Sequence, residues 1–108
     1  MQIKIISQNI SLSKDQEDLI RAKVEKLATY AGKIYDESSE IKVEMSHEHA
    51  KKPEQAYGCI LTIFVPKSTL RAEARMESVR SVVDEAIEKI KGQIEHYKAK
   101  LHHMDERK

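Results

Sequence analysis

Lysines recur at helical spacing in two segments of this chain, and of all its residues they are best suited to bind a charged partner. Three lines are formed by Lys23, Lys26, Tyr30 and Lys33; by Lys91 and Lys98; and by Lys89, Gln93, His96 and Lys100. Residues three or four apart lie on one side of a helix. Such rows of ammonium groups suit the phosphate oxygens of a nucleic acid. The alternative, equally open, is that the lysine stems cover apolar surface while the charges stay solvated.

Catalytic motifs are missing from the sequence. Only three glycines occur, and there is no glycine-rich phosphate loop, G-x-S-x-G elbow or HExxH pair. Cys59 alternates in step with Leu61 and Ile63, which favours a buried core thiol over a nucleophile. We therefore expect no enzyme activity, no cofactor and no small-molecule substrate.

Histidines offer the other candidate chemistry. His47 and His49 are two residues apart and could share a metal with His102 or His103, but nothing in the pattern fixes a third ligand. A solvated loop edge is the better interpretation, and the sequence predicts no metal site.

The composition limits the class of protein. A chain of 108 residues, 40% hydrophobic and 34% charged, fits one globular domain, and its single Phe and lack of Trp require an aliphatic core. With one cysteine no internal disulfide is possible, and no apolar run suggests a signal peptide or a membrane span. We expect a soluble cytoplasmic protein. The net charge is only +1, but acids concentrate in 36–50 and bases in 89–103.

The elements that must position the lysines follow from periodicity. Alternating or apolar runs predict strands at 2–5, 41–45, 57–65 and 69–77. Ser13 with Gln16 forms a capping box that should start a helix at Lys14, and Ser78 should cap a second, long helix. Their apolar stripes are Ile20, Val24, Leu27, Ala31 and Ile34, and Val79, Val83, Ala86, Ile90, Ile94, Tyr97 and Leu101. Residues 47–55, which include Pro53, read as a loop.

The order β-α-β-β-β-α predicts an α+β fold of two layers, with both helices on one face of a four-stranded mixed sheet. The first two strands should be parallel, joined by a right-handed crossover, and the last two should form a hairpin around Pro66. On the outer side of 69–77, Arg71 and Arg75 alternate with Glu73 and Glu77. This row is either an exposed charge ladder or part of a surface for a charged partner.

Four segments in this order resemble the ribosome hibernation promoting factor family, also called ribosome-associated inhibitor A or sigma-54 modulation proteins. The segments are MQIKI, RAKVEKLATY, TLRAEA and VVDEAIEKIKGQI, and the resemblance spans residues 1–101. Residues 102–108 would be a short polar tail. The chain resembles a short family member, without the C-terminal dimerisation domain that long members add.

The resemblance implies a fold layered like that of double-stranded-RNA-binding domains. It also implies binding to the 16S rRNA of the small subunit, in the mRNA and tRNA channel of the 70S ribosome, and repression of translation in stationary phase or stress. Neither a membrane nor a small molecule is implied as a partner. Together with the basic lines, it gives as candidate rRNA-binding residues Lys23, Lys26, Tyr30, Arg71, Lys89, Lys91 and Lys98.

The sequence departs from the family pattern at several positions. Relatives often carry Arg where Glu17 and Gly92 stand, and they open the second helix differently from Ser78–Arg80. A second hypothesis, which follows the older sigma-factor name of the family, is a regulatory protein–protein module that would use Ile60 and Phe64 on the open sheet face. Salt distinguishes the two, because RNA binding weakens steeply with salt and an apolar interface does not.

Overall fold

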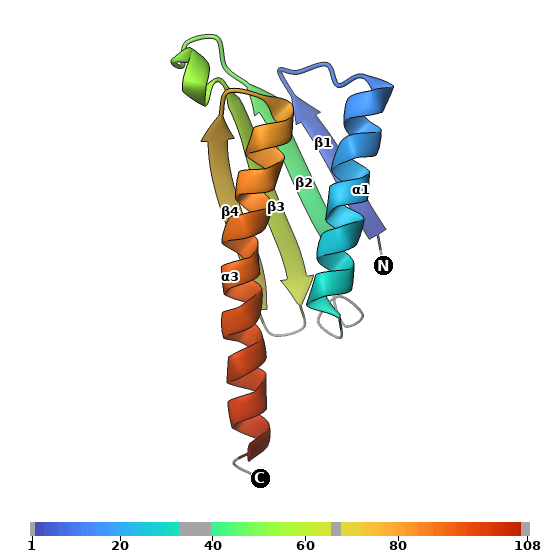
Figure 1. Cartoon of the computed structure of the whole chain (residues 1–108), viewed down its shortest axis with the longest axis vertical. Helices are drawn as coiled ribbons and strands as arrows, with labels where there is room; N and C mark the ends of the chain where they lie inside the picture. Colours follow the sequence, from blue (N-terminus) through green and yellow to red (C-terminus); the bar gives the residue numbers. More distant parts are fainter. Residues whose placement is uncertain (1, 33–39, 66–67, 107–108) are drawn as a thin grey trace.

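The fold is seen in a computed structural model that describes residues 2–32, 40–65 and 68–106, with only the backbone described for 101–106. Its elements are β1 (Gln2–Gln8), α1 (Lys14–Ala31), β2 (Glu40–His47), the short 3₁₀ helix η1 (Pro53–Gln55), β3 (Tyr57–Val65), β4 (Ser68–Met76) and α3 (Val79–Glu106). The predicted order of strands and long helices is confirmed (Figure 1).

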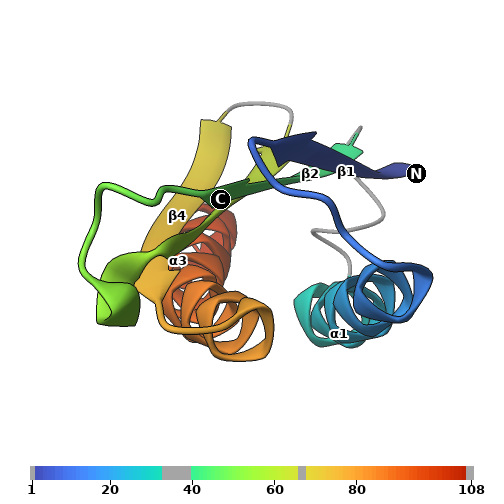
Figure 2. The same ribbon diagram turned by 90° about the horizontal axis from the view of Figure 1, so that it is seen from above.

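The four strands lie in the sheet in the order in which they occur in the chain. β1 is parallel to β2, with Ile3 opposite Ile41, while β2–β3 and β3–β4 are antiparallel pairs. Both helices cover the same face of this mixed sheet, and the other face is left open by them (Figure 2). The two-layer α+β prediction is therefore confirmed.

Local capping fixes where each helix begins. The Gln16 amide donates to the Ser13 hydroxyl over 3.1 Å, and the Gln16 side chain accepts from the Ser13 amide over 3.0 Å, as the capping box predicts. At the start of α3 the Ser81 amide donates to Ser78 Oγ over 3.1 Å. α1 is capped at its C-terminal end by Gly32, whose φ of 59° is a conformation that favours glycine.

The core lies between the sheet and the two helices. Leu61 and Ile63 of β3 are fully buried together with Leu27 of α1 and Ile90 of α3, as expected from the strand alternation. The buried stripe of α3 is wider than the sequence indicated, because Val82 and Ile87 are also buried. α3 packs against both the sheet and α1, so more than one side of it is apolar.

Two segments differ from the prediction. The expected loop contains η1, because Pro53 at its first position has the fixed φ that a helical turn needs. α3 continues to Glu106, through most of the segment expected to be a tail. The predictions for Lys33, Ile34, the turn at Pro66 and the side chains of Leu101, His102 and His103 lie outside the described residues. No described helix is long and apolar enough to span a membrane.

Cys59 is fully buried in this core, and burial raises the pKa of its thiol to about 12. Because the thiolate is the reactive form, we expect iodoacetamide at pH 8 to leave folded protein unmodified and to alkylate Cys59 only after unfolding. Mass spectrometry of labelled protein, with and without urea, measures this. Rapid alkylation of the folded chain would mean that the thiol is accessible and that its assignment to the core is wrong.

A candidate nucleic-acid interface between the two helices

α1 and α3 run side by side in the same direction (Figures 1 and 2). Side chains of both helices line one groove. The groove has a volume of about 250 Å³. Two apolar side chains, Leu27 and Ile87, form part of its lining. The other lining residues are Lys23, Lys26 and Tyr30 of α1 and Asp84, Glu88 and Lys91 of α3. The structure thus brings Lys23, Lys26 and Tyr30 of one basic line and Lys91 of another to the same groove.

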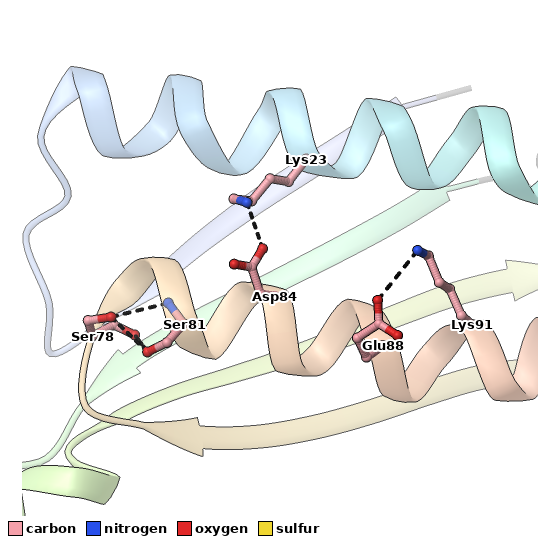
Figure 3. Close-up of polar contacts among 6 residues, drawn as sticks. All are labelled: Lys23, Ser78, Ser81, Asp84, Glu88 and Lys91. Carbon is pink, nitrogen blue, oxygen red and sulfur yellow. Dashed lines mark hydrogen bonds and ion pairs between the residues drawn. The ribbon is translucent and has the colours of Figure 1, made fainter.

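Two of the three lysines that line the groove have carboxylate partners within it. Lys23 Nζ lies 2.6 Å from Asp84 Oδ1, across the two helices, and Lys91 Nζ lies 3.5 Å from Glu88 Oε1 on the same helix (Figure 3). Lys26 is exposed and forms no ion pair with another described residue. Three lysines therefore face two carboxylates, and the groove has only a small excess of positive charge.

Tyr30 connects the groove to the next turn of α3. Its hydroxyl donates a hydrogen bond to Glu95, and its ring centroid lies 5.2 Å from Lys91 Nζ and 4.9 Å from Lys98 Nζ. Lys98 also donates to the backbone oxygen of Tyr30 over 3.1 Å. The hydrogen bond to Glu95, some burial and the charges of Glu95 and Glu88 raise the pKa of the phenol. Tyr30 therefore holds two ammonium groups in place by cation–π contact.

Lys89 lies on the other flank of α3, beside β4. Its ammonium donates to the backbone oxygen of Glu73 over 3.0 Å. A second hollow, of about 360 Å³, lies on this flank and is lined by Ser68, Leu70, Lys89, Gly92, Gln93, His96, Tyr97 and Lys100. The sequence placed Lys89 and Lys91 on opposite flanks of α3 and did not decide which flank faces α1. In the structure the flank with Lys91 borders the groove, and the flank with Lys89 does not.

Arg71 is also separate from the groove, since it projects from the open face of the sheet. Its guanidinium lies 2.7 Å from the Glu73 carboxylate, and both side chains are more than half exposed. Arg75, two residues on, has its Nε donating to the backbone oxygen of Gln55 over 2.9 Å. It also covers Gly58, where an added Cβ would lie only 2.7 Å from the guanidinium. In the structure, Arg71 belongs to a charge ladder and Arg75 holds η1 against the sheet.

A model of one protein family matches residues 3–102, nearly the whole described fold. Its description is sigma 54 modulation protein / S30EA ribosomal protein. The chain belongs to this family. The resemblance drawn from the sequence is confirmed, and the match spans both helices that form the groove.

Solved structures share this family fold. A ribosomal subunit interface protein from Coxiella burnetii is 23% identical, with a TM-score of 0.72 over 92% of this chain and 99% of that one. The N-terminal domain of Protein Y from Thermus thermophilus is 19% identical, with a TM-score of 0.67 over 90% and 99% of the two chains. At these identities the likeness shows the fold. A search of the curated proteins finds no match.

The open sheet face of this S30EA-family chain holds the residues of the alternative hypothesis. Ile60 and Phe64 are half-buried there rather than fully exposed, and the Lys42 ammonium lies 5.7 Å from the Phe64 ring centroid. His47 and His49 pack edge to face at 4.4 Å between ring centroids. Within the ranges that the structure describes, no group of three potential metal ligands comes together.

The acidic partners of Lys23, Lys91 and Lys98 were missed in the sequence. The pairs Glu88–Lys91 and Glu95–Lys98 have a spacing of three, which was a usable signal for ion pairs on one helix. The pair Lys23–Asp84 joins residues that are 61 positions apart, so only the packing of α1 against α3 reveals it.

Proposed function

We propose that this chain binds the small ribosomal subunit through the phosphate backbone of 16S rRNA, along the groove between α1 and α3. By occupying the channel for mRNA and tRNA it would repress translation in stationary phase or stress, in the cytoplasm and without covalent chemistry. Membership of the S30EA ribosomal protein family supports a ribosomal partner. The observation that carries the proposal is the convergence of Lys23, Lys26 and Lys91 on one groove.

The proposed contact is an exchange of partners. Phosphate oxygens would accept hydrogen bonds from ammonium groups that now face Asp84 and Glu88. Such exposed ion pairs contribute only about 0–1 kcal/mol each, so an approaching phosphate can replace them at low cost. Tyr30 has its ring against two ammonium groups and its hydroxyl on Glu95, so it would position lysines rather than stack on a base. Backbone and shape recognition follow from this arrangement.

The direct test is cosedimentation with purified 30S subunits and 70S ribosomes over a series of salt concentrations. Each phosphate contact should contribute about 0.7–0.9 to the slope of log affinity against log salt, by analogy with other nucleic acids. Competition by mRNA and initiator tRNA tests the channel. An affinity that ignores salt but is lost when Ile60 and Phe64 are replaced by serine would contradict the proposal and favour the protein–protein module.

Removing the groove carboxylates should strengthen ribosome binding. The double variant Asp84→Asn, Glu88→Gln frees Lys23 and Lys91 and removes two negative charges that an incoming phosphate meets. With a repulsion of about 1 kcal/mol per pair of unit charges 4 Å apart in water, we expect affinity to rise about 3- to 30-fold. Equilibrium binding to 30S subunits at fixed salt measures this.

The matched control is Glu44→Gln with Glu73→Gln, which removes two carboxylates from the open sheet face instead. It should change the affinity far less, since those carboxylates lie outside the groove. If the groove variant binds more weakly than the unmodified chain, the ion pairs position the lysines for RNA and the idea that they compete with it is wrong.

A further inference from the structure

β4 is the last strand of the sheet, and one side of its backbone faces away from β3. In an antiparallel pair, alternate residues direct both their N–H and C=O groups toward the neighbouring strand, and the residues between them direct theirs outward. Arg71 is one of the outward-facing residues, because both its backbone groups bond to α3 rather than to β3. Thr69, Glu73 and Arg75 have the same parity. Such an edge normally offers a template for another strand.

One side chain occupies both backbone groups of Arg71. The Arg71 amide donates to Gln93 Oε1 over 2.9 Å, and Gln93 Nε2 donates to the Arg71 oxygen. A residue of an added antiparallel strand would make this same pair of bonds, one as acceptor and one as donor. The carboxamide of Gln93 therefore takes the place of one residue of a missing fifth strand.

Lys89 makes a similar contact with Glu73, the next residue of β4 whose backbone groups face outward. Its ammonium donates to the Glu73 oxygen over 3.0 Å. The spacing explains why both contacts form. Four residues of a helix rise about 6.0 Å and two residues of a strand about 6.6 Å. The distance from Lys89 to Gln93 along α3 therefore matches the distance from Glu73 to Arg71 along β4. α3 runs opposite to β4 (Figure 1), which matches this order of partners.

The approach of the helix to the strand also has a local cause. Ala72 and Ala74 are the buried residues of β4 beside Arg71 and Glu73, and both are small. Small side chains let two backbones pack closely. The Gln93 side chain, which is shorter than that of Lys89, can therefore reach the strand edge.

We propose that Gln93 and Lys89 close the β4 edge, and that this edge, when opened, is a pairing surface for β4 of a second copy of this chain. The charges on the strand are self-complementary in one antiparallel register. If Arg71 of one copy lies opposite Glu73 of the other, symmetry places Glu73 opposite Arg71 as well, and both residues have outward backbone groups. The closure keeps the folded chain a monomer.

Amide hydrogen exchange of the unmodified chain tests the closure directly. The Arg71 amide should exchange about 2- to 10-fold more slowly than the Glu73 amide, as expected for one hydrogen bond. The Glu73 amide has the same parity but finds no acceptor among the described residues. Equal exchange of the two amides, after correction for sequence effects, would overturn the proposal.

Gln93→Ala opens the edge, and we expect two results: Arg71 exchange rises to the rate of Glu73, and sedimentation velocity shows dimers at micromolar to millimolar concentration. Adding Arg71→Glu places acid opposite acid in the proposed register and should restore the monomer. A variant that stays monomeric, or dimers that persist with Arg71→Glu, would contradict pairing through β4. Should Gln93→Ala not fold, Gln93→Glu takes its place in sedimentation, because it loses the donor to the Arg71 oxygen. It keeps the acceptor for the Arg71 amide, so exchange of that amide should then stay slow while dimers form.

Discussion

Replacing Lys23 and Lys26 together with glutamate is expected to weaken binding to the 30S subunit about 100-fold or more. Both lysines lie in the groove between the helices, and Lys26 forms no ion pair with the described residues that would have to be broken first. A hydrogen bond to a charged group contributes about 1.5–3 kcal/mol, so the loss of two gives about 3–6 kcal/mol. The slope of log affinity against log salt should fall by about 1.4–1.8. Equilibrium binding at several salt concentrations measures both quantities.

The control must change the net charge equally at another place. Lys51→Glu with Lys52→Glu does so in the exposed segment before η1, and His47→Ala with His49→Ala alters the end of β2 near it. Both double variants should bind nearly as well as the unmodified chain. Thermal melting of the double variant Lys23→Gln, Lys26→Gln shows whether the groove lysines stabilise the fold. We expect its free energy of unfolding to differ from that of the unmodified chain by no more than about 1 kcal/mol. If the Lys23→Glu, Lys26→Glu variant binds the 30S subunit as tightly as the unmodified chain while the His47→Ala, His49→Ala variant loses binding, the groove is not the binding site.

Leu61→Ala should destabilise the fold by about 2–5 kcal/mol. Leu61 is fully buried in the middle of β3, between Val43 of β2 and Ala72 of β4 in the sheet. Its truncation removes buried apolar contacts and leaves a cavity that surrounding residues fill only in part. Urea unfolding followed by circular dichroism measures the loss.

Ile60→Ala is the matched control for this variant, because Ile60 is the adjacent residue on the open face and is half-buried. Its cost should be clearly smaller. A loss below about 1 kcal/mol for Leu61→Ala would mean that the core does not depend on this side chain as its burial indicates.

Features that depend on neighbouring residues could be predicted from the sequence. The capping box of Ser13 and Gln16 has both partners within one turn, and alternation alone placed Leu61 inside and Arg71 outside. The crossover rule gave the parallel β1–β2 pair. The 3₁₀ turn at Pro53 was missed because a proline in a polar segment fits either a loop or a helical start.

The arrangement of the candidate site could be predicted only in part, because it depends on how α3 is rotated against α1 and β4. Periodicity put Lys89 and Lys91 on different flanks but could not say which flank faces α1. The structure turns Lys91 toward Tyr30 and Lys89 toward the Glu73 backbone. The partners Asp84 and Gln93 depend on the same rotation, and nothing local in the sequence specifies them.

The parallel pairing of β1 with β2 has a consequence for how the groove comes into being. Gln2 pairs with Glu40 across the whole of α1, whereas β2, β3 and β4 follow one another as antiparallel neighbours. Closing a long loop costs more chain entropy than closing a short one, so we expect the antiparallel strands and α3 to assemble early and β1 with α1 to dock late. The groove exists only once that last step is complete. A ligand bound in the groove would then stabilise the docked position of β1 and α1. It would reduce the local opening of these two elements more than that of the remaining sheet.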